Sequence, residues 1–228
     1  MAIFPSTYIH VGGDEVDKSY WKRCSRCQQH IKKEGLKGEE ELQSYFVRRM
    51  EKYLLARNRK LLGWDEILEG GLAPSATVVS WRGERGGIVA AKMGHMVVMS
   101  PSDPLYFNRY QAGPDGEPLA AEFSINTLER VYGYNPQPEA LNSDEKKYVL
   151  GGQAALWTEF ISSASHLEYM LLPRLLALAE ALWTPLDQKD LKTFLQRHIG
   201  WHFNAWQQKG ISFHPAHFTG QTHERNRQ

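Results

Sequence analysis

The sequence predicts an α/β fold in which short parallel strands alternate with helices. Apolar runs of strand length recur along the chain, at about residues 8–11, 61–64, 77–81, 95–99 and 149–157. Segments with residues at helical spacing lie between or after them, at residues 39–59, 86–93, 165–183 and 186–208. This alternation is typical of parallel βα units. The strands of a parallel barrel all end on one face, where ligands bind, so the residues after each strand are the candidates for function.

The first predicted strand, Tyr8-Ile9-His10-Val11, ends at two glycines, which let the backbone bend sharply and let a ligand come close. A polar stretch follows. The helix predicted over residues 39–59 is amphipathic. Its positions at helical spacing are Leu42, Tyr45, Phe46, Arg49, Met50, Tyr53 and Leu54.

The middle of the chain predicts three further elements and a long loop. Residues 77–81 and 96–99 are rich in valine, a β-branched residue that favours strands, and a short helix is expected between them. Residues 100–147 are rich in Pro, Gly, Asn and Asp, which is typical of a functional loop.

The C-terminal part predicts one strand and two helices. The strand at 149–157 is followed by a strongly apolar helix at 165–183. An amphipathic helix is expected at 186–208, with Asp187 near its N-terminus.

Composition limits the possible partners. The chain has 228 residues, enough for one sizeable domain, and its 27 Lys and Arg nearly balance its 26 Asp and Glu. The net charge of +1 gives no reason to expect nucleic acid or an anionic membrane as partner. No apolar run is long enough to span a membrane, and residues 1–5 lack the pattern of a secretory signal, so a cytoplasmic location is the default expectation.

Cys24 and Cys27 form a C-x-x-C pair, and His30 is nearby. A structural zinc site needs about four ligands, and the sequence has no second C-x-x-C pair. We therefore expect a structural or incidental role and no metal site, with redox chemistry or metal binding as the alternatives.

Asp14 and Glu15 follow the two glycines after the first strand. Adjacent carboxylates are usually a solvated surface pair, but at a strand end they point into the space where ligands bind. This placement predicts acid/base chemistry, with carbohydrates as one substrate class. Aromatic and polar residues also follow other predicted strands: Trp64-Asp65-Glu66, Trp81-Arg82 and Trp157-Thr158-Glu159.

Four motifs occur in the order found in one known family: His10-Val11-Gly12-Gly13-Asp14-Glu15, Gly63-Trp64-Asp65-Glu66, Ser80-Trp81-Arg82-Gly83 and Leu156-Trp157-Thr158-Glu159. The chain resembles family 20 glycoside hydrolases, the β-N-acetylhexosaminidases, from about residue 7 to about residue 206. The resemblance implies a (β/α)8 TIM barrel and a retaining exo-hydrolase that needs no cofactor. Its substrates would be N-acetylhexosamine-containing glycans or chitooligosaccharides with terminal β-linked GlcNAc or GalNAc. The acetamido oxygen of the substrate would attack C1 and form an oxazolinium ion, an exception to the two-carboxylate mechanism.

The resemblance also implies a role for each matched residue. Glu15 would be the general acid/base, and Asp14 would orient the acetamide and stabilise the positive charge that develops. Six residues would bind the substrate: Trp64, Trp81 and Trp157 as aromatic walls, Tyr106 as a donor to the acetamide oxygen, and Asn108 and Glu159 as partners of ring hydroxyls. The family usually has Asp at the position of Asn108, so recognition at that end of the sugar is expected to differ. His10 would support the two carboxylates.

Other roles stay open for the same residues. A Trp at a strand end is more often part of the core, Tyr106 could pack a loop, and strand-end polar groups also cap helices. Asp65 and Arg82 could form a structural ion pair and are left out of the site. Two functional alternatives are an ordinary two-carboxylate glycosidase that uses Glu15 and Glu159, and a catalytically weak or silent half-barrel that binds N-acetyl sugars.

The position of the acidic pair carries a further expectation. In the family this pair follows the fourth strand of the barrel, so the five predicted strands are equivalent to strands 4–8. Residues 1–218 would then be the C-terminal portion of a TIM-barrel catalytic domain, and residues 219–228 a polar tail. An Arg that holds the outer sugar hydroxyls in the family has no match. An open five-stranded sheet has exposed edges, which predicts a homodimer that completes the barrel, with truncation as the alternative.

Overall fold

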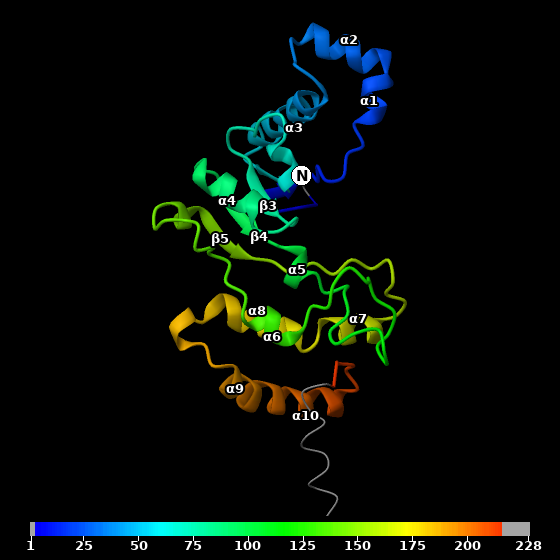
Figure 1. Cartoon of the computed structure of the whole chain (residues 1–228), viewed down its shortest axis with the longest axis vertical. Coiled ribbons are helices and arrows are strands. Elements are labelled where there is room, and N and C mark those ends of the chain that lie inside the picture. The colour runs from blue at the N-terminus through cyan, green and yellow to red at the C-terminus, as the bar shows by residue number, and fades with distance from the viewer. Residues whose placement is uncertain (1–2, 216–228) are drawn as a thin grey trace, which may run out of the picture. The chain divides into compact units, whose positions relative to one another are not determined.

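The computed structural model describes residues 3–215 and has two compact units. The first unit comprises Met1–Met99 and Gln137–Gly151, and the second comprises Ser100–Pro136 and Gly152–Gln228. The first unit contains a five-stranded parallel sheet whose strand order follows the chain (Figure 1). Its strands are β1 (Tyr8–His10), β2 (Lys60–Trp64), β3 (Thr77–Ser80), β4 (Val97–Met99) and β5 (Val149–Gly152). The predicted fold class, part of a parallel α/β barrel, is confirmed.

The inner strands of the sheet are buried because they are apolar and rich in valine, whereas β1 and β5 are not buried. Ile9 pairs with Leu61, Gly63 with Val78, and Val79 with Val98. Leu61, Val78, Val79 and Val97 are completely buried, as expected for strands that are covered on both faces.

The last strand is shorter than predicted. β5 ends at Gly152 instead of residue 157. Ala155 forms only an isolated parallel bridge, with Tyr106 in the second unit. Trp157 and Glu159 therefore lie on a loop several residues beyond the strand.

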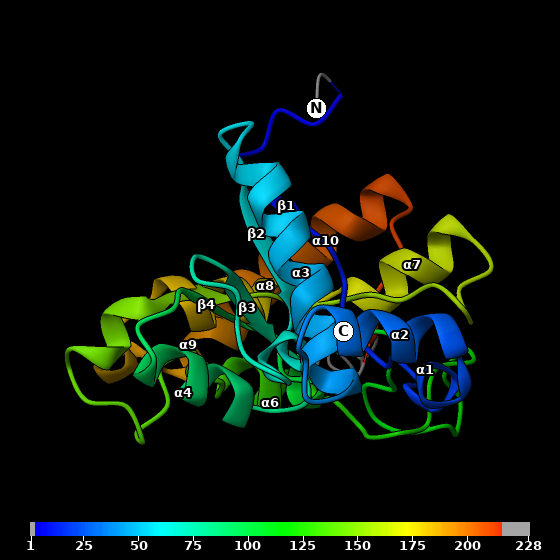
Figure 2. The same cartoon turned by 90° about the horizontal axis from the view of Figure 1, so that it is seen from above.

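Helices α3 (Glu39–Leu55) and α4 (Arg85–Lys92) pack on this sheet. Figure 2 shows α3 alongside β2. The helix predicted over residues 39–59 exists and ends at Leu55. Of the positions at helical spacing, Leu54 is buried, whereas Phe46 and Tyr53 are 60% and 51% exposed. The buried positions are Gln43, Ser44, Val47, Glu51 and Leu54.

Polar side chains of α3 are buried because they bind backbone groups of the first unit. Gln43 Nε2 donates to the carbonyl of Gly13 at 2.8 Å. Glu51 Oε1 accepts from the backbone N–H of Ser75 at 2.7 Å. Hydropathy alone could not identify this face, since these contacts depend on tertiary neighbours.

The polar stretch after the acidic pair, for which no helix was predicted, is helical. It forms α1 (Ser19–Arg23) and α2 (Ser25–Lys33). Asp17 Oδ1 accepts from the backbone N–H of Ser19 at 2.9 Å, where α1 begins. Ile31 is the buried residue of α2, so the apolar periodicity was too weak to reveal these helices.

The second unit contains short helices where the sequence predicted a long loop and two long helices. The loop over residues 100–147 includes α5 (Ser102–Leu105), α6 (Leu128–Tyr132) and a 3₁₀ turn (Glu145–Tyr148) that belongs to the first unit. The helix predicted at 165–183 is interrupted at Pro173, which lacks an N–H and disfavours a helical residue before it. Its two parts are α7 (Ala164–Leu171) and α8 (Arg174–Trp183).

The last predicted helix is also divided. A 3₁₀ turn (Leu186–Gln188) precedes α9 (Leu191–Phe194), a π-helical segment (Leu195–Ile199) and α10 (Gly200–Lys209). Asp190, three residues after the expected Asp187, is the N-cap, and its side chain accepts from the backbone N–H of Lys192 at 3.0 Å. The polar tail predicted at 219–228 lies outside the described residues. No helix in the described part of the chain is long and apolar enough to cross a membrane.

Arg174 organises the interior of the second unit. Its side chain is fully buried, and its guanidinium donates to four backbone carbonyls, at 3.0 Å to Arg109 and Asn126 and at 2.6 Å to Phe107 and Met170. Burial lowers the pKa of Arg174 to about 9. The four acceptors compensate for lost hydration, so this one side chain fixes α8 to the loop that carries Tyr106 and Asn108.

Candidate active site

The acidic pair lies on a tight glycine turn after β1. Gly12 and Gly13 have φ of +74° and +107°, a region that favours glycine. A Cβ on Gly13 would lie 2.7 Å from Cγ2 of the buried Ile67, so no larger residue fits without displacement. Glu15 has a φ of +48°, which is uncommon for a residue with a side chain, and strained backbone of this kind clusters at active sites. Both carboxylates are exposed at the end of β1.

The turn is anchored to the neighbouring strand. The backbone N–H of Val11 donates to Leu62 at 2.9 Å, and that of Trp64 donates to Gly12 at 3.0 Å. These bonds hold Asp14 and Glu15 at a fixed position beside the end of β2.

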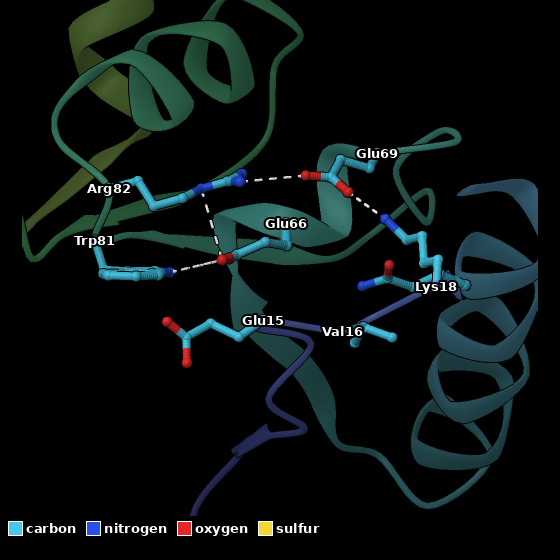
Figure 3. Close-up of a pocket in the computed structure, with 8 residues that line it drawn as sticks. Glu15, Val16, Lys18, Glu66, Glu69, Trp81 and Arg82 are labelled. Atoms are coloured by element: carbon cyan, nitrogen blue, oxygen red, sulfur yellow. Dashed lines mark hydrogen bonds and ion pairs between the residues drawn. The ribbon is translucent and has the colours of Figure 1, made fainter. Parts of the chain in front are cut away.

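Glu15 lines a cavity of about 290 Å³ in the first unit (Figure 3). The lining residues are Glu15, Val16, Lys18, Gln43, Glu66, Glu69, Trp81 and Arg82. The Glu15 carboxylate points to the side of the cavity where the indole of Trp81 lies. A carboxylate that is open to solvent and beside an aromatic wall can exchange a proton with a ligand bound there.

The indole of Trp81 is held by the buried carboxylate of Glu66. Its Nε1 donates to Glu66 Oε1 at 3.1 Å and Oε2 at 3.0 Å. Burial raises the pKa of Glu66, and the indole hydrogen bond partly opposes this effect. The bond restricts rotation of the indole, so Trp81 presents a defined surface to the cavity.

Asp65 joins the end of β2 to the segment that follows β3. The side chain is nearly completely buried; Oδ2 accepts from the backbone N–H groups of Trp81 and Arg82 at 3.0 and 3.1 Å, and Oδ1 accepts from Arg82 Nε at 2.5 Å. Arg82 also pairs with Glu69 at 3.2 Å, and Glu69 pairs with Lys18. Burial disfavours the charge of Arg82, but the carboxylates, Asp65 above all, hold its pKa above the ordinary value. The ion pair considered from the sequence therefore exists and extends to the rim of the cavity.

His10 contacts both the acidic turn and Trp64. Its Nδ1 accepts from the backbone N–H of Gly12 at 3.0 Å, and its ring lies 4.7 Å from the ring of the buried Trp64. Desolvation lowers the pKa of His10, and the negative charge of Asp14 opposes this shift. A neutral imidazole is also what the acceptor role of Nδ1 requires.

The second unit brings together the other four predicted residues in two pairs. In the first pair, the rings of Tyr106 and Trp157 meet edge to face with centroids 6.2 Å apart. Two backbone bonds align their segments, from Phe107 N to the carbonyl of Ala155 at 2.7 Å and from Ala155 N to that of Leu105 at 3.0 Å. Tyr106 is buried, whereas Trp157 is 43% exposed.

In the second pair, Asn108 Nδ2 donates to Glu159 Oε1 at 3.0 Å. A carboxylate only accepts hydrogen bonds, which places the amide nitrogen of Asn108 on this side. Asn108 is buried, and within the described part of the chain its Oδ1 has no hydrogen-bond partner. A buried amide oxygen without a donor can accept a hydrogen bond from a ligand hydroxyl.

Several residues that line the cavity were not predicted as site residues from the sequence. Glu66 belongs to the quoted motif Gly63-Trp64-Asp65-Glu66, so its signal was present but no role was assigned to it. Lys18 and Glu69 are 51 positions apart, and no local pattern could have paired them. Within residues 3–215, no group of three or more His, Cys, Asp or Glu is arranged to hold a metal ion.

Comparison with known proteins gives a consistent result. The model of the glycosyl hydrolase family 20 catalytic domain matches residues 1–186. A β-hexosaminidase of Porphyromonas gingivalis is 54% identical over 196 residues, which are 86% of this chain and 25% of that protein. A β-hexosaminidase of Vibrio furnissii is 35% identical over 180 residues, 78% of this chain and 30% of that protein.

Solved structures agree in fold. The family 20 exo-β-N-acetylglucosaminidase of Vibrio harveyi in complex with N-acetylglucosamine has a TM-score of 0.85 and 31% identity, over 93% of this chain and 34% of that one. The β-N-acetylhexosaminidase of Bacteroides fragilis has a TM-score of 0.78 and 29% identity, over 94% and 43%. The chain thus spans less than half the length of these relatives. On the strength of the matched domain and these similarities, it belongs to glycosyl hydrolase family 20 and contains part of the catalytic domain.

Proposed function

We propose that this chain carries the catalytic acid of a retaining exo-β-N-acetylhexosaminidase, which removes terminal β-linked GlcNAc or GalNAc. The observation that supports this most is the cavity in which the exposed carboxylate of Glu15 faces the anchored indole of Trp81. The substrates would be N-acetylhexosamine-containing glycans or chitooligosaccharides. A solved relative was crystallised with N-acetylglucosamine, which is consistent with this substrate class.

In the proposed reaction, Glu15 protonates the glycosidic oxygen while the 2-acetamido oxygen attacks C1. This forms an oxazolinium ion, and Glu15 then takes a proton from the water that opens it. Asp14 accepts a hydrogen bond from the acetamide N–H and stabilises the positive charge of the ion. Adjacent residues on one turn suit these two roles, since a separate protein nucleophile on the opposite sugar face is not needed.

The aromatic residues would bind the acetamide methyl group and the sugar ring. Trp64 and Trp81 follow β2 and β3 in the first unit, and Tyr106 and Trp157 form the aromatic pair of the second. A methyl group gains from contact with such rings, whereas a hydroxyl at the same place would gain little.

Asn108 and Glu159 would bind ring hydroxyls. The amide N–H of Asn108 is used by Glu159, which leaves its Oδ1 as an acceptor for one hydroxyl. An Asp at this position would offer two acceptor oxygens. We therefore propose that Asn108 changes hydroxyl recognition relative to family members with Asp.

The nucleophile can be tested through the substrate. The turnover rates of this chain would be compared on two sets of chromogenic substrates. The first set is the β-GlcNAc, β-GalNAc and β-glucoside substrates, and the second is the N-acetyl, N-fluoroacetyl and N-trifluoroacetyl glucosaminides. We expect no turnover of the glucoside and slower turnover as fluorine withdraws electrons from the acetamide oxygen. Turnover of the glucoside at a similar rate would instead support the two-carboxylate mechanism with Glu15 and Glu159.

The roles of the acidic pair can be tested by substitution. Glu15→Gln should lower kcat about 10²- to 10⁴-fold, less for an aryl leaving group that departs without protonation. Asp14→Asn should lower kcat by about 10²-fold or more for every leaving group, because the acetamide loses its partner. If wild type and Glu15→Gln show equal background rates but bind N-acetylglucosamine, the chain is a silent sugar-binding protein. The predicted homodimer stays a prediction, and light scattering of the same sample tests it.

A further inference from the structure

Cys24 and Cys27 lie at the junction of α1 and α2, outside the proposed site. Cys24 is both the C-cap of α1 and the N-cap of α2, and Cys27 is in the first turn of α2. Both are free thiols of intermediate exposure. They are also the only two cysteines of the 228-residue sequence, so any thiol chemistry of this chain belongs to this pair.

The two side chains are on the same face of the first turn. Residues three apart in a helix are surface neighbours with Cβ atoms about 5–6 Å apart. The Cβ atoms of a disulfide lie about 3.5–4.5 Å apart, so bond formation requires the N-cap residue Cys24 to move toward Cys27 by about 1–2 Å. The backbone N–H of Cys27, and then its thiol, lower the pKa of Cys24, whereas the contact with Cys24 raises the pKa of Cys27. The two thiols therefore interact directly, and Cys24 is the better nucleophile.

The junction holds this arrangement in place. Cys24 N donates to the carbonyl of Trp21 at 3.2 Å, and the carbonyl of Cys24 accepts from Gln28 N at 3.0 Å. The side chain of Gln28 links the junction to α3, since its Nε2 donates to the carbonyl of Trp21 and to Glu39 Oε1, each at 2.9 Å. Both thiols thus sit on a supported turn that is partly accessible to small molecules.

Metal binding fits this pair less well than redox chemistry. Structural zinc needs about four ligands, and within residues 3–215 no third His, Cys, Asp or Glu joins the thiols in a group that could hold a metal. Three exposed cations lie close to the pair in the sequence, Lys22, Arg23 and Arg26, and the charge of Arg26 lowers the pKa of Cys24. Arg26 thus favours the thiolate of Cys24 and the approach of an anionic reagent such as glutathione disulfide.

We propose that Cys24 and Cys27 are a redox-active dithiol that low-molecular-weight disulfides of the glutathione type convert to an intramolecular disulfide. The Cys24 thiolate attacks one sulfur of the reagent, which forms a mixed disulfide and releases one reduced thiol. The sulfur of Cys27 then attacks Cys24, forms the Cys24–Cys27 bond and releases the second thiol. One reagent disulfide is reduced to two thiols as the protein dithiol is oxidised, and each protein thiol gives up one proton.

The test uses glutathione disulfide with the folded chain and with Cys24→Ser, Cys27→Ser and the double variant. In the wild type, titratable thiols should fall from two to none, and the intact mass should fall by two hydrogen atoms without an adduct. Cys27→Ser should accumulate a glutathione adduct, because the resolving thiol is gone. Cys24→Ser should react more slowly, and the double variant should not react. Circular dichroism of each variant checks that the fold is retained.

Three outcomes would overturn the proposal: a stable glutathione adduct on the wild type, no reaction of the folded wild type, or oxidation that occurs only in urea. Because the assay reads thiols and mass, it does not depend on glycosidase activity.

Discussion

Asp65→Asn tests the ion-pair network that positions Trp81. In the wild type, three donors converge on this carboxylate: the backbone N–H groups of Trp81 and Arg82 and the Nε–H of Arg82. An Asn side chain has one oxygen, so it can accept hydrogen bonds either from the two backbone N–H groups or from the guanidinium. Its NH₂ group then faces the donors that the oxygen does not accept from. Arg82 is 46% exposed and can turn to water, so we expect the oxygen to keep the backbone donors.

The size of the effect follows from this count. A hydrogen bond to a charged group contributes about 1.5–3 kcal/mol, and the exposure of Arg82 reduces the loss to about 1–2 kcal/mol. Asp65→Ala also leaves two backbone donors without an acceptor, each at a cost of about 1–3 kcal/mol, so its loss should reach about 3–8 kcal/mol. Asp144→Asn is the matched control, because Asp144 is an 87% exposed carboxylate paired with Lys147, and its loss should stay within about 0.5 kcal/mol.

The assay is urea unfolding of the four proteins, followed by tryptophan fluorescence and circular dichroism. The expected order, from most to least destabilised, is Asp65→Ala, Asp65→Asn and Asp144→Asn. This order would be refuted if Asp65→Asn were no more destabilised than the surface control, or if Asp65→Ala were no more destabilised than Asp65→Asn. Asp65→Ala should also raise the KM for a GlcNAc substrate, because the backbone N–H of Trp81 loses its acceptor.

Three further predictions concern single side chains. Glu66 has a raised pKa, so the stabilisation that its protonated form provides is present below the unfolded pKa and lost as pH rises through the folded pKa. Glu66→Gln should lack this loss, so the difference between the urea midpoints of the wild type and the variant should change across the acidic and neutral range. A difference that stays constant with pH would contradict this prediction. Arg174→Met should lower the free energy of unfolding by about 3–5 kcal/mol because four carbonyls lose their donor, with Arg174→Lys intermediate; a change below about 1 kcal/mol would contradict the role of Arg174. Asn108→Asp replaces the amide that donates to Glu159 with a carboxylate, so two carboxylates then face each other. Their interaction should add a pH dependence to the KM for a GlcNAc substrate that is absent from the wild-type profile, measured as KM against pH.

Much of the sheet could be predicted because its signals are local. Consecutive valines in β3 and β4, and the glycines after β1, are read from a few neighbouring residues. One error has a local cause too, since Pro173 divides the helix predicted at residues 165–183. The exposed Phe46 and the buried Gln43 show where periodicity failed, since the face of α3 is set by backbone groups that the helix must bind.

By itself, the sequence determined the parallel α/β class, the position of Asp14 and Glu15 at a strand end, and the family that its motifs resemble. Each depends on short-range order in the chain. The tertiary structure alone decided that Glu66 anchors Trp81 across 15 positions, that Lys18 meets Glu69 across 51, and that Asn108 donates to Glu159 while its Oδ1 stays without a donor in the described structure. Such contacts form because packing brings distant segments together and buried polar groups need partners, and neither condition is visible in the order of the residues.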